Sequence, residues 1–281
     1  MLGYDGSPQA AEAIETAAAL FPGAHAWITY LWSPPFASDA VRRRLWERAA
    51  DVNDLIALVE REGELEARRV TAMGMTLARA AGWQAEPLLQ RSWTAEGAAL
   101  AQSAESVGAD LVVVGSRGLG GSDALLGSVS DMVVHYCRCP VVVVPHPMLS
   151  AEHEAVVNGP VVLGWDGSAG SLAAYASARA LFPSRQIVAV SVGETAQPPP
   201  PGADSDSLVT HVTVDRGRGF GHRPVVNALL DAAADRDAAV VVVGSRGRSA
   251  ARELLIGSVA MGTLHHSHRP VMVVANPPTP G

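Results

Sequence analysis

The sequence predicts an α/β protein of two tandem lobes, each with a mostly parallel sheet covered by helices on both faces. The first observation is an internal repeat: residues 5–7 recur at 166–168, and residues 112–118 recur at 241–247. A repeat this long indicates tandem domains rather than a solenoid. Second, helical and strand patterns alternate along each lobe. Third, apolar runs such as 141–144 lack polar alternation, which is typical of strands buried on both faces.

In lobe one, Pro8 stands in the first turn of an Ala-rich helix, where proline is favoured, and Gly82 ends a long helical segment. Helices are expected at 8–20, about 40–81, 94–107 and 127–137. Strands are expected at 26–31, 85–89, 111–114 and 141–144.

Lobe two repeats this order from residue 161, but four consecutive prolines at 198–201 replace the long helix. Such a run reads as an extended linker, so the strand at 208–214 follows directly and the second helix is missing. We expect lobe one at 1–147, a linker at 148–159 and lobe two at 160–281. The first strand of lobe one reads as truncated, and we expect the true start upstream.

Composition excludes several classes of protein. The 281 residues carry a net charge of −7, and all 21 basic residues are arginine. Without lysine there is no Walker-A lysine, pyridoxal-phosphate Schiff base or kinase lysine, and the acidic balance argues against a nucleic-acid surface. No apolar stretch approaches the roughly 20 residues of a spanning helix, and no signal peptide is visible. We expect a soluble, cytoplasmic protein, with no membrane partner, whose Cys137 and Cys139 diverge from a helix end as reduced thiols.

Each lobe carries Gly-x-x-Gly, a spacer and Gly-Ser between a strand and a helix. The spacer has eight residues in lobe one and nine in lobe two. In an open parallel sheet, ligands bind beyond the carboxyl ends of the strands. Glycines let backbone N–H groups approach phosphates, and the following helix N-terminus favours anions. Ser128 and Ser258 are candidates either for the helix N-cap or for a phosphate contact.

These motifs, with the two Gly-x-Asp-Gly-Ser segments, resemble tandem universal stress proteins over nearly the whole chain. The ATP-binding subgroup has the pattern Gly-x2-Gly-x9-Gly-(Ser/Thr), which lobe two matches in full and lobe one misses by one residue. The resemblance implies a Rossmann-like sheet of order 3-2-1-4-5 in each lobe, with the lobes paired through their last strands. It also implies ATP, alone or with Mg²⁺ or Mn²⁺, in a cleft over the sheet.

By the same resemblance, each lobe supplies ten nucleotide-binding residues. In lobe two, an aspartate and a valine would contact the adenosine, and the glycine loop and helix start would hold the phosphates; the residues are Asp166, Val192, Val243, Gly244, Arg246, Gly247, Gly257, Ser258, Val259 and Ala260. The lobe-one equivalents are Asp5, Leu31, Val114, Gly115, Arg117, Gly118, Gly127, Ser128, Val129 and Ser130. We expect a bulky residue in place of Gly244 to abolish binding in lobe two.

Other interpretations stay open at this point. Asp5 and Asp166 suit an Asx-turn before Gly-Ser, independent of any ligand. The cluster His265, His266 and His268 lacks completing ligands and reads as a solvated helix end rather than a metal site. We expect a stress-response protein that senses or sequesters ATP, has no catalytic residues, and signals to an unknown protein partner through conformation or association. A homodimer is a possible assembly. The alternative functions are a non-binding dimerisation scaffold that pairs through 141–144 and 271–274, and a slow ATPase.

Overall fold

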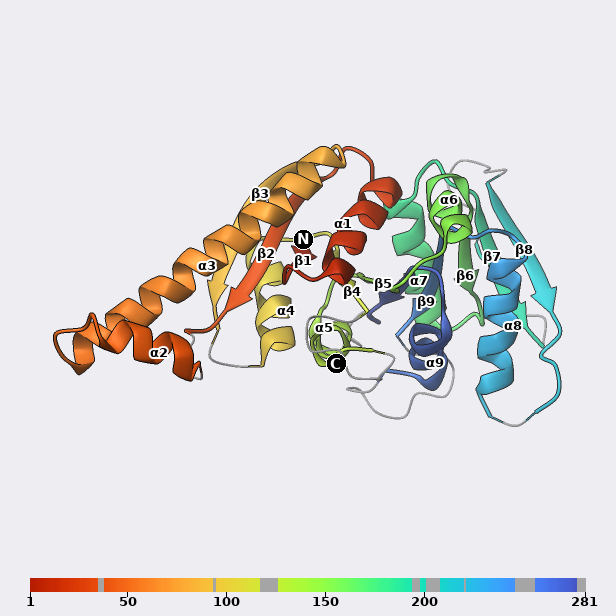
Figure 1. The fold of residues 1–281 in the computed structure, drawn as a ribbon. Coiled ribbons are helices and arrows are strands. Elements are labelled where there is room, and N and C mark those ends of the chain that lie inside the picture. Colours follow the sequence, from red (N-terminus) through yellow and green to blue (C-terminus); the bar gives the residue numbers. More distant parts are fainter. Residues whose placement is uncertain are drawn as a thin grey trace.

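The two lobes form one continuous sheet of ten strands. The computed structural model describes residues 1–34, 38–92, 95–116, 126–193, 198–200, 208–219, 221–245 and 256–276. Within them the strand order is β3-β2-β1-β4-β5-β10-β9-β6-β7-β8 (Figure 1). Each half therefore has the order 3-2-1-4-5 expected for the family, and all neighbours within a half are parallel.

Lobe one follows the predicted alternation. Its strands are β1 (Leu2–Gly3), β2 (His25–Trp32), β3 (Gln84–Arg91), β4 (Val112–Gly115) and β5 (Val141–Val144). Its helices are α1 (Pro8–Leu20), α2 (Asp39–Trp46), α3 (Val52–Ala80), α4 (Glu96–Ser106) and α5 (Ser128–Tyr136). The short β1 pairs with β2 on one side and β4 on the other.

Lobe two repeats the plan, and between β7 and β8 its described residues contain no helix. Its strands are β6 (Val161–Gly164), β7 (Ile187–Val192), β8 (Val209–Val214), β9 (Val240–Gly244) and β10 (Val271–Val274). Its helices are α7 (Ala169–Leu181), α8 (Arg223–Ala234) and α9 (Ser258–His266).

The lobes meet through their last strands. β5 and β10 pair antiparallel, with Val142 opposite Met272 at the centre of the register. On one face of this join, Phe21 and Phe182, which follow the ends of α1 and α7, stack with ring centroids 5.1 Å apart. These phenylalanines occupy the same position in the two repeats, so the lobes are related by an approximate two-fold axis. Because β5 pairs with β4 and β10, and β10 with β9 and β5, neither strand has an open edge for a second chain.

Helices cover both faces of the sheet and enclose two apolar cores. One core joins α1, α3, α6 and α7 to the sheet, and the other joins α4, α5, α8 and α9. The valine-rich central strands contribute to both cores because successive side chains point to opposite faces. None of the described helices is both long enough and apolar enough to cross a membrane.

Two segments differ from the sequence prediction. The helix expected at about 40–81 is two helices, because Asp51 caps a new helix start by accepting the N–H of Asp54 at 2.9 Å. The linker expected at 148–159 contains a helix, α6 (Ser150–Asn158), which packs on α1. Figure 1 shows α3 extending beyond the sheet, with α2 beside its N-terminal part.

Candidate functional site

Each lobe gathers its predicted site residues at the carboxyl edge of the sheet. β1 and β6 lead into the Asp-Gly-Ser turn, and β4 and β9 lead into the glycine-rich loop. The first β strand and the fourth are neighbours in both halves, so the turn and the loop start side by side. Four of the predicted residues, Arg117, Gly118, Arg246 and Gly247, lie outside the described residues.

Asp5 and Asp166 both hold the turn that starts the first helix. Asp5 Oδ1 accepts the N–H of Ser7 at 2.9 Å, and Asp166 Oδ1 accepts the N–H of Ser168 at 3.0 Å. In lobe one the glycine between Asp5 and Ser7, Gly6, has a φ of +83°, a conformation that L side chains rarely adopt. The Asx-turn interpretation is therefore correct for Oδ1, and contact with a nucleotide remains a prediction for the same side chains.

Ser7 and Ser168 cap the helices that follow this turn. Ser7 Oγ accepts the N–H of Ala10 at 3.1 Å, and Ser168 Oγ accepts the N–H of Ser171 at 3.2 Å. These bonds satisfy donors that the first turn of a helix leaves without a partner.

The helices after the glycine loops begin differently. Their N-cap residues are Gly127 and Gly257, and neither helix has a side-chain cap hydrogen bond within the described structure. Ser128 and Ser258 are exposed first residues of α5 and α9, so the interpretation of these serines as N-caps is wrong. The first-turn N–H groups and the positive ends of these helix dipoles lie at the sheet edge, an arrangement that favours anions.

Backbone bonds fix where each of these helices starts. The N–H of Gly127 donates to Ser116 O, and that of Gly257 donates to Ser245 O, both at 2.7 Å. These two N–H groups are thus committed to the protein, and the phosphate donors expected next in each helix are residues 128 and 129, or 258 and 259. In lobe one the Ser130 hydroxyl also donates to Gly115 O at 2.6 Å, a bond that Ala260 cannot make in lobe two.

Gly244 has a packing role of its own. A Cβ at this position would lie 2.5 Å from the carbonyl carbon and oxygen of Gly170 in α7. A bulky residue there would push β9 away from α7 whether or not a ligand binds. Loss of binding in such a variant would therefore not establish a nucleotide contact, contrary to the expectation from the sequence.

The apolar site residues share the face covered by α4, α5, α8 and α9. Val114 and Val243 are 4% exposed, while Leu31 and Val192 are partly buried against the same core. Val129 and Ala260, in the first turns of α5 and α9, belong to that core as well. Of these residues Leu31, Val129 and Val192 are only partly buried, so they are the ones that a ligand could contact.

Asn276 was not identified from the sequence. It follows β10, and its backbone N–H donates to Ser245 Oγ at 3.2 Å. Its Oδ1 is buried and has no hydrogen-bond partner among the residues that the structure describes. A buried amide oxygen of this kind calls for a donor, such as a water, a hydroxyl or an amino group of a ligand.

Comparison with known proteins identifies the fold family. The model of the universal stress protein family matches twice, over residues 1–145 and 158–275. The chain belongs to the universal stress protein family. Membership supports a role in stress response, and the two matches agree with the internal repeat.

Curated relatives and a solved structure show the same relationship. A universal stress protein of Mycolicibacterium smegmatis is 35% identical over 60% of this chain and 63% of its own length. One of Mycobacterium tuberculosis H37Rv is 32% identical over 59% of this chain and 61% of its length. These matches thus span less than two thirds of the relatives. The crystal structure of a universal stress protein from Archaeoglobus fulgidus superposes with a TM-score of 0.66 at 19% identity, covering 99% of this chain and 98% of that one.

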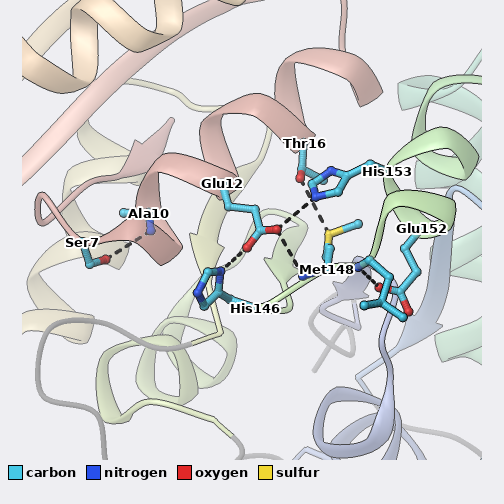
Figure 2. A network of polar contacts seen from close by, with 9 residues as sticks. Ser7, Ala10, Glu12, Thr16, His146, Met148, Glu152 and His153 are labelled. Carbon is cyan, nitrogen blue, oxygen red and sulfur yellow. Dashed lines mark hydrogen bonds and ion pairs between the residues drawn. The ribbon is translucent and has the colours of Figure 1, made fainter.

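A polar cluster ties the linker to lobe one. Glu12 of α1 contacts His146 Nδ1, accepts the N–H of Met148 at 3.1 Å, and lies 3.1 Å from His153 Nε2 of α6 (Figure 2). The Glu12 side chain is only 13% exposed. The equivalent position in lobe two is Ala173, so the repeat contained no signal for this cluster.

Arg185 ties the same linker to lobe two. Its guanidinium donates to Val156 O at 2.9 Å and Gly159 O at 3.0 Å at the end of α6, and to Ala19 O at 3.2 Å at the end of α1. Burial lowers the pKa of Arg185. The carbonyls at helix C-termini carry the negative end of the helix dipole, which favours this cation.

Cys137 and Cys139 are both free thiols, as the sequence predicts. Cys137 follows the end of α5 at Tyr136 and has extended backbone, with φ −68° and ψ 137°. His265 and His266 end α9, and no group of three His, Cys, Asp or Glu side chains in the described residues could hold a metal ion.

Proposed function

We propose that this universal stress protein binds ATP at the carboxyl edge of each lobe and reports its occupancy through conformation or association. The observation that carries the proposal is the pair of uncapped helix starts at Gly127 and Gly257, each placed beside an Asp-Gly-Ser turn. The phosphates would lie on the first-turn N–H groups, and the adenosine would lie toward Asp5 and Asp166.

Three features support the proposal. Ser128 and Ser258, the first residues of these helices, are exposed, which would let a ligand approach the helix starts. The partly buried Leu31 in lobe one and Val192 in lobe two would pack against an adenine ring. In lobe two, the unpartnered Oδ1 of Asn276 offers an acceptor at the same edge.

Direct measurement of bound nucleotide is the first test. Freshly purified protein is denatured, and the released nucleotide is counted per chain by chromatography and mass spectrometry. Titration calorimetry with ATP, with and without Mg²⁺ or Mn²⁺, follows for protein that arrives empty. We expect two ATP per chain if the shorter loop of lobe one is functional, and one if only lobe two binds. No ATP in either measurement would overturn the proposal.

Substitution at the helix starts tests the location without disturbing the fold. Ser258→Asp puts a carboxylate at the first position of α9, which suits the helix dipole but repels phosphate. Charges about 4 Å apart interact by about 1–4 kcal/mol near a protein surface, so we expect ATP to bind at least about tenfold more weakly in lobe two. Ser258→Ala is the matched neutral variant: it removes only the hydroxyl, so it should weaken ATP binding much less than Ser258→Asp does. Ser128→Asp makes the same test for lobe one. Unchanged affinity in both aspartate variants would place the phosphates elsewhere.

Slow hydrolysis is measured in the same samples. The proposal expects ATP to remain intact over the time of the binding experiment, because it assigns the site to binding and signalling. Accumulation of ADP that Ser258→Asp or Ser128→Asp abolishes would instead support an ATPase.

A further inference from the structure

The two lobes cover the aromatic residue after their first strand differently. In lobe one, α3 packs on β2 and β3 (Figure 1), and a Cβ on its Gly74 would lie 2.7 Å from Tyr4 Cδ1. Trp165 occupies the position of Tyr4 in lobe two, where no described helix joins β7 to β8. Trp165 is nevertheless only 5% exposed, so groups other than a counterpart of α3 bury it.

Tyr175 of α7 joins this tryptophan to a proline-rich segment. The Trp165 and Tyr175 rings meet edge to face, with centroids 6.1 Å apart and an interplanar angle of 72°. The Tyr175 hydroxyl donates to Pro200 O at 3.1 Å. Pro199 is buried, whereas Pro198 and Pro200 are exposed. The proline segment therefore presents one edge to the protein and the other to solvent.

The conformation of this segment follows from its covalent structure. Proline fixes its own φ at about −65° and holds the residue before it in the extended region. Residues 198, 199 and 200 are prolines that each precede another proline, so all three favour the polyproline II helix. That helix has no internal hydrogen bonds, and its carbonyl oxygens stay available as acceptors. A buried proline beside a carbonyl that accepts from a tyrosine is how proline-rich peptides dock on aromatic side chains.

Hydrogen bonds hold the aromatic pair in place on lobe two. The Ser191 hydroxyl donates to Trp165 O at 3.0 Å, and its oxygen lies 2.8 Å from His211 Nε2 of β8. Ser191 and His211 lie on the sheet face that α7 covers, because alternate residues of a strand share a face. The surface that contacts the prolines is thus built on α7 and the ends of neighbouring strands, so it is already formed before a ligand arrives.

We propose that Trp165 and Tyr175 form a polyproline-binding surface, which residues 198–200 fill in the isolated chain and a proline-rich segment of a partner protein takes over. The partner has the chemistry of the segment already seated there: consecutive prolines with a carbonyl for the Tyr175 hydroxyl. Residues 198–200 belong to no helix or strand, so their release breaks no described element. The surface lies on the opposite sheet face from Val192, and the inference does not depend on the nucleotide site.

Competition between the tethered segment and an added peptide tests the proposal. A short tether gives the chain's own prolines an effective concentration of about millimolar, which weakens binding of any external peptide. The probe is fluorescein-labelled decaproline, followed by fluorescence polarisation. A double variant, Pro199→Gly with Pro200→Gly, removes the tethered competitor and should bind decaproline at least about tenfold more tightly than the unaltered chain does. A labelled Gly-Ser peptide of equal length should bind neither chain.

Tyr175→Phe in the double variant locates the peptide. It removes only the hydroxyl donor and should weaken decaproline binding by about 2- to 10-fold, the range for one hydrogen bond. Tyr136→Phe in the same background is the matched control, because Tyr136 is an exposed tyrosine of α5, and it should leave binding unchanged. Circular dichroism establishes that each variant is folded, and the milder Pro199→Ala should shift binding in the same direction as the double variant.

Four outcomes would overturn the proposal. The first is no binding of decaproline to the folded double variant, and the second is equal affinity for the double variant and the unaltered chain. The third is equal affinity of the Tyr175→Phe and Tyr136→Phe chains, which would place the peptide elsewhere. The fourth is a dimer of the unaltered chain in analytical ultracentrifugation that the double variant lacks, which would assign the proline segment to exchange between copies of this chain.

Discussion

Arg185 offers a sharp test of how the two lobes are held together. Its guanidinium contacts the ends of both α1 and α6. Arg185→Met removes the charge while keeping much of the side chain's volume. Each of the three hydrogen bonds from this cation contributes about 1.5–3 kcal/mol when fully shielded from water. Because the side chain is only partly buried, water replaces some of these bonds in the variant. We therefore expect a loss of about 2–3 kcal/mol in the free energy of unfolding, far below the sum of three shielded bonds.

Urea denaturation followed by tryptophan fluorescence measures this loss. Arg61→Met is the matched control, because Arg61 is an exposed arginine of α3. It should change stability by no more than about 0.5 kcal/mol. In thermal denaturation, Arg185→Met should lower the midpoint by about 5–10 °C, from about 2–4 °C per kcal/mol for proteins near this size. If Arg185→Met unfolds as Arg61→Met does, the three carbonyl contacts do not stabilise the join between the lobes.

Three further measurements test the polar contacts. Glu12→Gln keeps the shape of the side chain but removes the carboxylate that faces two histidines, so we expect about 1–3 kcal/mol lower stability by urea denaturation, and an unchanged midpoint would contradict this role. Ser7→Ala and Ser168→Ala should each cost about 1 kcal/mol by loss of a helix cap, whereas Ser128→Ala, which removes no cap, should cost less than about 0.5 kcal/mol; equal losses in all three would refute the assignment of caps. In the unaltered protein, the alkylation rate of Cys139 should rise with pH through a midpoint of about 7, because only the thiolate reacts. In guanidinium chloride the midpoint should return to about 8.5, and a midpoint of about 8.5 in the folded protein would contradict the lowered pKa.

The fold was predictable because it depends on local sequence patterns, such as apolar strand segments, that occur in both lobes. The runs at 111–114 and 141–144 are buried on both faces, and they become β4 and β5 within one residue of the predicted bounds. The family resemblance supplied the strand order. The break between α2 and α3 was missed because its cause is a single cap by Asp51, inside a segment whose composition is helical throughout.

The residues that join the lobes were not predictable from the repeat, because they lie where the repeat fails. Glu12 corresponds to Ala173, and Arg185 corresponds to Ala24. Each makes contacts with the linker, which occurs once in the chain, so neither has a partner at a fixed spacing.

The glycines of the two loops are not all required for the same reason, so the Gly-x-x-Gly…Gly-Ser pattern as a whole is not evidence for a ligand. Gly244 is explained by the backbone of Gly170, which leaves no space for a Cβ, so this glycine alone says nothing about a ligand. Gly257 is different: its φ of −67° and ψ of 153° are open to any residue, and the N-cap position it occupies favours a side chain that can accept a hydrogen bond. A serine or aspartate there could accept a hydrogen bond from a first-turn N–H group, whereas Gly257 has no side chain to do so. The same holds for Gly127, with φ −71° and ψ 151°, at the start of α5. Packing against Gly170 therefore accounts for the first glycine of the lobe-two pattern. The proposed nucleotide site would account for the last glycine in both lobes, because a bound phosphate needs those N–H groups.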